Sequence, residues 1–258
     1  MRPVPSRAAS GTIVPSALSI VIPAKDEAGR VGQSLDAILA AHFDPPLLEI
    51  IVVDDGSSDR TSEVAASRAA RARERGTDLR VIRHTPTRGK GFSMKRGVLD
   101  ARGDIVLMTD ADLSAPIGEA PVILAPILDN TADVVFGSRA IDRSKIGVRA
   151  PLLRDYGGRF FNVLMRTIAG LPFADTQCGF KAFRRDAVRP VFDRQTIDGF
   201  GFDVEILYIA RKRGLRLREV PVAWNDSPET RVRFARDAAV MFLDLFRVRL
   251  NDRRGRYN

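Results

Sequence analysis

Two aspartates one residue apart, Asp110 and Asp112, directly follow the apolar run at residues 105–109. Residues two apart in a strand point to the same side, so both carboxylates can converge on one point if the chain leaves a sheet here. Open α/β sheets bind ligands at the carboxyl ends of their strands. Paired carboxylates at such an edge suit a hard divalent cation, and the cation suits a diphosphate. The alternative is an ordinary turn in which aspartate caps backbone amides.

A second acidic turn, Asp54-Asp55-Gly56-Ser57, follows the apolar run at residues 49–53. A strand there would place this turn on the same sheet edge as the first aspartate pair. One carboxylate could then accept a hydrogen bond from the imide N–H of a nucleobase. The alternative is a capping turn for the next helix, since serine and aspartate are good capping residues. Both interpretations can hold, with one aspartate capping and the other facing a ligand.

A basic, glycine-rich loop, Arg88-Gly89-Lys90-Gly91, is predicted to open a helix. Glycines let a backbone approach a ligand closely, and helix N-termini favour anions. The loop lacks the spacing of a dinucleotide fingerprint and the Ser/Thr of a Walker loop. The alternative is a basic loop exposed to solvent.

Arginines and buried acidic residues mark the second half of the chain. Arg139 follows a predicted strand, and Arg154 lies beyond a stretch rich in glycine and proline; both could grip a phosphate with two hydrogen bonds. The alternative for each is a plain surface arginine. Asp203 and Glu205 lie in an apolar segment, where ionised groups need partners and become site candidates. A structural ion pair with an arginine is the alternative for these two acids.

The elements that must position these residues alternate between strands and helices. Strands are predicted at residues 18–22, 49–53, 79–82 and 105–109, with helices at 27–41, 61–75 and 91–101. This alternation predicts a doubly wound, mostly parallel α/β sheet. Further elements follow less regularly, at residues 117–128, 132–136, 155–170, 179–184, 217–224 and 230–250. We expect a flexible tail at 1–16, one main domain at 17–228, and a basic amphipathic helix with a tail at 229–258.

Composition limits the function classes. The 258 residues carry a net charge of +9, and residues 231–258 hold eight arginines against three aspartates. This favours anionic partners: a phospholipid surface, nucleic acid or a phosphorylated substrate. The single Cys178 excludes an internal disulfide and fits a reducing compartment. His42 and His84 share no metal-binding spacing and are expected to be structural. No run reaches the roughly 20 apolar residues of a spanning helix, so we expect no membrane crossing.

Several motifs together resemble the inverting glycosyltransferase family 2, which has the GT-A fold. They are Val-Ile-Pro-Ala-Lys-Asp-Glu at 21–27, Ile-Val-Val-Asp-Asp-Gly-Ser at 51–57, the basic loop at 88–91 and Asp-Ala-Asp at 110–112. Residues 137–140, 175–181 and 202–210 look like the dolichyl-phosphate β-glucosyltransferase group within it. The related mannose synthases usually differ at 175–181. The resemblance covers roughly residues 18–225.

The resemblance implies transfer of a sugar from a nucleotide-diphosphate sugar to a polyprenyl monophosphate. UDP-glucose is the donor that we expect before any other. The positions matching the family's donor-binding residues are Pro23, Ala24, Glu27, Asp54, Asp55, Lys90 and Asp110. By the same pattern, Asp110 and Asp112 would hold Mg²⁺ or Mn²⁺, with Asp112 as the direct ligand. The chain departs from the mannose synthases at Ser114, where those proteins often have glutamine.

The resemblance also implies an acceptor side. Arg139 and Arg154 match the positions that grip the acceptor phosphate, whereas Gly158 stands where a serine commonly joins them. Asp203 could orient an arginine or the sugar and is not expected to be a base. Helices around residues 160–168 and 230–250 carry apolar faces that could bind an anionic membrane, or could simply pack on the core.

Three other functions stay open. The first is another donor, GDP-mannose or UDP-N-acetylhexosamine, and the second is a water-soluble acceptor. The third is a basic nucleic-acid or membrane-binding protein without catalysis, which leaves the motifs at the sheet edge unexplained. We therefore expect an enzyme without a nucleic-acid partner, peripheral on the cytoplasmic face of a membrane, with a small membrane protein as a further possible partner.

Overall fold

The computed structural model describes residues 17–148, 167–225 and 234–258. The expected tail at 1–16, Arg154, Gly158 and most of the helix expected at 155–170 lie outside these residues. The main sheet has seven strands in the order β3-β2-β1-β4-β7-β5-β8. Their bounds are β1 (Leu18–Ala24), β2 (Leu47–Asp54), β3 (Asp78–Arg83), β4 (Ile105–Met108), β5 (Val134–Ser138), β7 (Lys181–Arg184) and β8 (Leu217–Pro221).

The sheet is parallel except at one strand. β1 pairs in parallel with β2 and β4, and β5 pairs in parallel with β8. β7 is antiparallel to both of its neighbours, β4 and β5. A small parallel sheet of β6 (Ile146–Val148) and β9 (Trp224–Asn225) lies apart from the main one. The prediction of a mostly parallel α/β sheet is confirmed.

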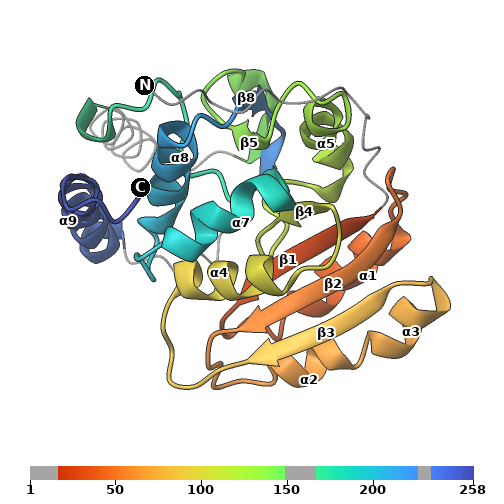
Figure 1. Ribbon diagram of the computed structural model, residues 1–258. Coiled ribbons are helices and arrows are strands. Elements are labelled where there is room, and N and C mark those ends of the chain that lie inside the picture. Colours follow the sequence, from red (N-terminus) through yellow and green to blue (C-terminus); the bar gives the residue numbers. More distant parts are fainter. Residues whose placement is uncertain (1–16, 149–166, 226–233) are drawn as a thin grey trace.

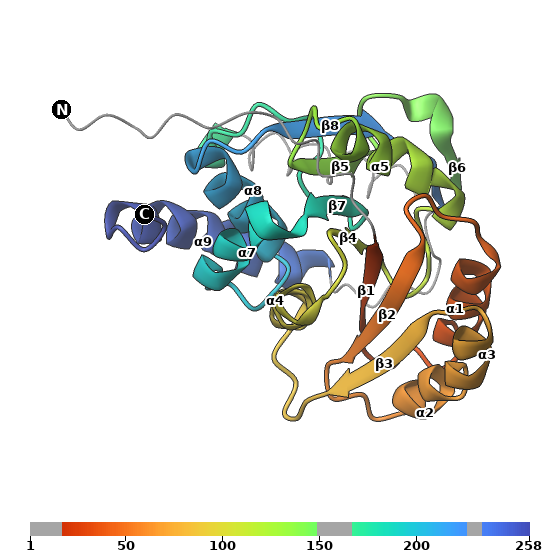
Figure 2. The same cartoon turned by 45° about the vertical axis from the view of Figure 1, so that its right-hand side comes forward.

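Helices cover both faces of the main sheet, as Figures 1 and 2 show. One apolar cluster packs one face under α1 (Val31–Ala40), α2 (Thr61–Ala66), α3 (Ala69–Glu74) and α5 (Ala120–Leu128). The other packs the opposite face under α4 (Lys90–Asp100), α7 (Arg185–Arg194), α8 (Phe202–Lys212) and α9 (Phe234–Arg253). Short 3₁₀ turns occupy Ile117–Glu119 and Arg143–Lys145.

The central strands are buried on both faces, which explains their nearly continuous apolar sequences. Every residue of β4 is buried, and so is every residue of β1 except Pro23. The expected strands at 18–22, 49–53, 79–82 and 105–109 all occur, each within two residues of its predicted ends. The helix expected at 61–75 is instead the two short helices α2 and α3.

Among the described residues, no helix is both long enough and apolar enough to span a membrane.

Candidate active site

The acidic turns lie at one edge of the sheet. Ala24 is in register with Asp54, so the ends of β1 and β2 coincide there. β4 runs parallel to β1 and ends at Met108, one residue before the loop that carries Asp110 and Asp112. The sequence-based expectation that these residues share an edge matches their position in the fold.

Backbone strain gathers at this edge. Asp26 has a φ of 53° and Leu113 a φ of 49°, and Asn130 is the one other non-glycine residue with positive φ among those described. Such conformations cost free energy and cluster at functional sites. Asp26 precedes the predicted donor residue Glu27, and Leu113 directly follows Asp112. The two strained positions therefore flank the predicted donor site.

The carboxylate of Asp54 is fully buried and holds its own turn. It accepts a hydrogen bond of 2.8 Å from the backbone N–H of Ser57 and another from the hydroxyl of Ser62. Arg83 Nε lies 3.7 Å from its second oxygen. The capping interpretation therefore describes Asp54 in this structure, and a contact with a nucleobase stays a prediction.

Asp55 fixes the basic loop that opens α4. Its carboxylate accepts hydrogen bonds of 2.7 and 2.9 Å from the backbone N–H groups of Arg88 and Gly89. His84 Nε2 lies 2.7 Å from the same carboxylate, in accord with the structural role expected for this histidine. Gly89 has a φ of 126°, and a Cβ there would lie 2.4 Å from the backbone oxygen of Asp198. Only glycine fits this position, which brings the loop close to Asp198.

Lys90, the first residue of α4, reaches across to the first aspartate of the pair. Its Nζ lies 2.6 Å from Oδ1 of Asp110. Burial alone would raise the pKa of Asp110, but the charge and hydrogen bond of Lys90, together with the charges of Lys181 and Arg139, lower it. Burial conversely lowers the pKa of Lys90, and the charges of Asp110 and Asp203 more than reverse this. Both groups are therefore ionised at neutral pH.

Asp112 is held by its own loop on one side and faces a cation on the other. Its Oδ1 accepts hydrogen bonds of 3.0 and 2.9 Å from the backbone N–H and the hydroxyl of Ser114. Its Oδ2 lies 3.9 Å from Arg30, which in turn forms a 2.7 Å ion pair with Glu27. No sequence motif singled out Arg30, because its proximity to Asp112 arises from folding.

The donor set at this edge fits a magnesium or manganese ion that is shared with a diphosphate. No group of three or more His, Cys, Asp or Glu residues suited to a metal occurs among the described residues. Mg²⁺ is usually bound by one or two carboxylates plus substrate phosphates, rather than by a cage made wholly of protein. Asp110 and Asp112 would supply those carboxylates, and in the structure Arg30 and Lys90 balance their charge.

A buried ion pair lies behind Lys90 and Asp110. Lys181, the first residue of β7, is fully buried and donates hydrogen bonds of 2.6 Å to the backbone oxygen of Cys178 and 2.5 Å to Asp203. Burial raises the pKa of Asp203, and the charges of Lys181 and Lys90 only partly offset this rise. The partner of Asp203 is thus a lysine rather than the arginine expected from the sequence.

Glu205 belongs to the scaffold. It accepts hydrogen bonds from the backbone N–H groups of Thr196 and Ile197 and from the hydroxyl of Tyr257. This carboxylate therefore fastens the 196–197 loop and the C-terminal residues to α8. Glu205 therefore has a structural role, as the alternative to a binding-site role foresaw. Its partners are backbone amides and hydroxyls, however, and not the expected arginine.

Arg139 follows β5 and is clamped in place. Its Nε and one terminal nitrogen bond the two oxygens of Asp175 at 2.6 and 3.0 Å, and its guanidinium lies 4.9 Å from the ring centre of Trp224. Burial would raise the pKa of Asp175, but Arg139 lowers it. Asp175 is itself oriented by Glu219, which accepts a 2.7 Å hydrogen bond from its backbone N–H. The Arg139 side chain is about one-third exposed at this edge.

Arg139 and Lys90 both interact electrostatically with Asp110, because the charge of each lowers the pKa of this carboxylate. The structure thus places Lys90 and Arg139 within electrostatic reach of the same carboxylate, Asp110. Arg154, the second predicted phosphate-binding residue, lies outside the described residues. Sequence reasoning overlooked Lys181 and Arg30 as charged members of this site.

The arrangement matches a known family. The model of the family described as Glycosyl transferase family 2 matches residues 19–192. The chain belongs to glycosyl transferase family 2. The family predicted from the motifs is confirmed, and with it the prediction of a glycosyltransferase enzyme.

Curated relatives in this family span most of the chain. Dolichyl-phosphate beta-glucosyltransferase ALG5C from Trichomonas vaginalis is 34% identical over 249 residues, covering 92% of this chain and 72% of that protein. Dolichyl-phosphate beta-glucosyltransferase from Homo sapiens is 34% identical over 224 residues, covering 81% of this chain and 67% of that protein. The family 2 enzyme is therefore related to dolichyl-phosphate glucosyltransferases.

Solved structures share the fold. Glucosyl-3-phosphoglycerate synthase from Mycobacterium tuberculosis, solved in complex with Mn²⁺, UDP-glucose and glycerol 3-phosphate, superposes with a TM-score of 0.61. The two chains are 21% identical, and the match covers 93% of this chain and 80% of the synthase. This likeness establishes the GT-A type of fold predicted from the sequence.

Proposed function

We propose that this family 2 enzyme transfers glucose from UDP-glucose to a polyprenyl monophosphate of the dolichyl type, with inversion at the anomeric carbon. The names of the relatives at 34% identity support the donor and acceptor classes. The observation that carries the proposal is that Asp110 interacts with the charges of two cations. Lys90 lies on the predicted donor side and Arg139 on the predicted acceptor side. A diphosphate and a monophosphate would thus meet between two cations.

The reaction is a direct displacement. An oxygen of the acceptor phosphate forms a bond to C1 of glucose while the bond from C1 to the UDP oxygen breaks, and UDP leaves with the electron pair. A phosphate monoester is already ionised near neutral pH, so no strong general base is required. Arg139 orients the attacking phosphate, and its clamp by Asp175 fixes the direction of the guanidinium.

The donor side stabilises the leaving group. Lys90, held ionised beside Asp110, offers positive charge to the departing diphosphate. Mg²⁺ or Mn²⁺, when held by Asp112 with Asp110, would neutralise charge growing on UDP. The Mn²⁺ bound with UDP-glucose in the solved glucosyl-3-phosphoglycerate synthase supports this choice. Pro23, Ala24, Glu27, Asp54 and Asp55 surround the nucleoside in this proposal. Asp203 acts through Lys181 as a positioning residue, not as a base.

The acceptor also implies a location. A polyprenyl phosphate resides in a bilayer, so the enzyme works at a membrane surface, and we place it peripherally on the cytoplasmic face. The single, buried Cys178, whose thiol has its pKa raised to about 12 by burial, is compatible with a reducing compartment. Arg154 and a small membrane protein stay as predicted contributors on the acceptor side.

A screen of donors and acceptors tests the proposal. Purified protein is incubated with Mg²⁺ or Mn²⁺, with UDP-glucose, GDP-mannose or UDP-N-acetylhexosamine, and with a polyprenyl phosphate or 3-phosphoglycerate. The expected result is a lipid product, labile in mild acid, formed fastest with UDP-glucose. A product formed only on 3-phosphoglycerate, or no lipid product with any donor, would overturn the proposal.

A further inference from the structure

The last helix, α9, has one buried face and one exposed apolar face. Leu245 and Val248 are each 1% exposed and pack within the apolar cluster that covers the sheet. On the opposite side, Leu243, Phe246 and Leu250 are 56%, 52% and 45% exposed. At about 100° of rotation per residue, these three side chains fall in a strip about 60° wide. Packing on the core therefore accounts for only one face of α9.

Arginines border this apolar strip on both sides. The same rotation places Arg247 and Arg254 along one border and Arg249 and Arg253 along the other. Arg253 and Arg254 are exposed and have no carboxylate partner among the residues that the structure describes. An apolar strip flanked by arginines, two of them without a carboxylate partner among the described residues, is the pattern of a helix that lies in the interface of an anionic bilayer.

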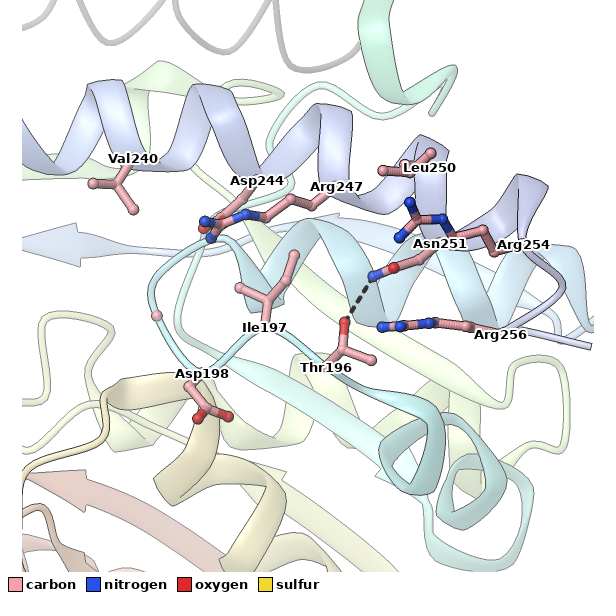
Figure 3. A pocket seen from close by; sticks show the side chains of 11 residues that line it. Thr196, Ile197, Asp198, Val240, Asp244, Arg247, Leu250, Asn251, Arg254 and Arg256 are labelled. Atoms are coloured by element: carbon pink, nitrogen blue, oxygen red, sulfur yellow. Dashed lines mark hydrogen bonds and ion pairs between the residues drawn. The ribbon is translucent and has the colours of Figure 1, made fainter.

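A basic hollow adjoins the strip (Figure 3). It lies between α9 and the loop at 196–199 and measures about 470 Å³. Its lining combines Leu250 of the strip with Arg247, Arg254 and Arg256. Arg247 is partly neutralised by Asp244 at 2.8 Å, whereas Arg254 and Arg256 have no ion pair within the described residues. The hollow thus offers positive charge at the level of the strip, where lipid phosphates would lie.

We infer that this face of α9, defined by Leu243, Phe246, Leu250 and the bordering arginines, docks on the surface of an anionic phospholipid bilayer. The apolar strip would enter the boundary between head groups and acyl chains, and the arginines would contact lipid phosphates. A second copy of the chain fits less well, because pairing two such faces would oppose unpaired arginines. The inference needs no particular donor or acceptor.

α9 lies between this surface and a segment of the active site. Gln177 Nε2 lies 3.9 Å from Met241 Sδ, so α9 contacts the segment that carries Asp175, the clamp of Arg139. Asp244 also packs against Gly201 at the start of α8, where a Cβ would lie 2.6 Å from its carboxylate. The same rotation places Met241 on the face of α9 opposite the strip, so the width of the helix would separate a docked bilayer from the segment that carries Asp175.

Vesicle sedimentation with the full chain tests the inference. The probes are vesicles of phosphatidylcholine alone and of phosphatidylcholine with about one-third phosphatidylglycerol, at moderate salt. Two variants remove the surface: Phe246→Ser with Leu250→Ser, and Arg253→Glu with Arg254→Glu. Two matched controls make equal changes elsewhere, at exposed positions of other elements: Leu48→Ser with Val122→Ser, and Arg73→Glu with Arg75→Glu.

The expected result is binding to the anionic vesicles that falls about tenfold or more in both surface variants, weakens with added salt, and is unchanged in both controls. Thermal melting checks that every variant folds, and turnover in detergent separates this inference from the proposed reaction. Equal binding to neutral vesicles, no binding by the parent chain, or binding retained by both surface variants would overturn it. A dimer that dissociates in these variants without a change in vesicle binding would identify a second copy as the occupant instead.

Discussion

Lys90 Nζ lies 2.6 Å from Asp110 Oδ1, which joins the first residue of α4 to the loop after β4. This pair is the charged centre of the site, because Lys90 also interacts electrostatically with Asp203 and Asp112. In the proposed reaction a metal ion binds the aspartates, and Lys90, which neutralises them in the free protein, would then contact the diphosphate of the donor. Removal of the Lys90 charge should therefore lower kcat/KM for the donor more than kcat/KM for the acceptor.

Replacement of Lys90 by methionine keeps an unbranched side chain, one atom shorter, and removes the charge. We expect kcat/KM for the nucleotide sugar to fall roughly 100-fold, since one preorganised charged donor to a leaving group contributes about that much. Initial rates at varied donor concentration measure the effect. Lys145→Met, at a lysine 3.7 Å from Glu119, is the matched control and should behave like the parent. Unchanged donor kinetics in Lys90→Met would refute the role.

Asp112 is predicted to be the direct metal ligand. In Asp112→Asn, we expect the affinity for Mn²⁺ in the presence of UDP to fall by about tenfold or more, because a neutral amide is a weaker ligand for a hard cation. Electron paramagnetic resonance of free Mn²⁺ measures this without turnover. Asp186→Asn, at an aspartate whose side chain is 86% exposed, serves as the control. If Asp112→Asn bound Mn²⁺ with the affinity of the parent, Asp112 would not be the direct ligand of the metal.

Gly179 leaves room for the carboxylate of Asp110. A Cβ at Gly179 would lie 2.2 Å from Oδ2 of Asp110, so Gly179→Ala must displace this carboxylate. Because small misplacements of site groups can cost about 100-fold, we expect a fall of that order in kcat. Gly118→Ala is the control, since nothing lies within 4 Å of a Cβ there. Steady-state rates compare the two variants, and equal activities would show that the position of Asp110 is unimportant.

Local pattern was sufficient to predict the first half of the fold. The apolar runs that became β1, β2 and β4 end in the turns that carry the acidic residues, so the sheet edge follows from the sequence. Pairing between distant strands leaves no local trace, and the antiparallel insertion of β7 between β4 and β5 was not predicted. α7 was missed although Val188, Val191 and Phe192 show helical spacing, because Pro190 interrupts the pattern.

Charge partners were the least predictable part of the site. Arg30 lies 3.9 Å from Asp112, and Lys181 bonds Asp203 at 2.5 Å, yet each pair joins different elements of the fold. The sequence identified Asp203 as costly to bury, which is a property of one residue. The identity of its partner depends on the packing of α8 against the sheet, and no spacing rule encodes that.

Arg139 is predicted to orient the acceptor phosphate. Arg139→Lys keeps the charge but loses the fork that bonds both oxygens of Asp175. We expect KM for polyprenyl phosphate to rise roughly tenfold or more, as for the loss of one hydrogen bond to a charged group. KM for the donor should change little. Arg218→Lys, at an exposed arginine of β8, is the control. If Arg139→Lys changed only the KM for the donor, the assignment of Arg139 to the acceptor would be contradicted.

Glu49 stabilises the edge of the sheet opposite the site. Its buried carboxylate in β2 accepts hydrogen bonds of 2.7 Å from Ser19, 2.6 Å from the backbone N–H of Arg102 and 2.7 Å from Arg80. Burial would raise the pKa of Glu49, but these hydrogen bonds lower it below its ordinary value of 4.5. The carboxylate therefore contributes to folding in its ionised form.

The free energy of unfolding should depend on pH accordingly. A depressed pKa in the folded state means that the contribution of Glu49 is fully present above its unfolded pKa and is lost as pH falls through the lower folded pKa. We expect Glu49→Gln to lower the free energy of unfolding by about 3 kcal/mol at pH 7, because it breaks a buried charge network. The difference from the parent should shrink as pH falls below 4.5. Urea denaturation across this range measures it, with the exposed Glu63→Gln as control. A difference that grew on acidification would show that Glu49 is not ionised in the folded protein.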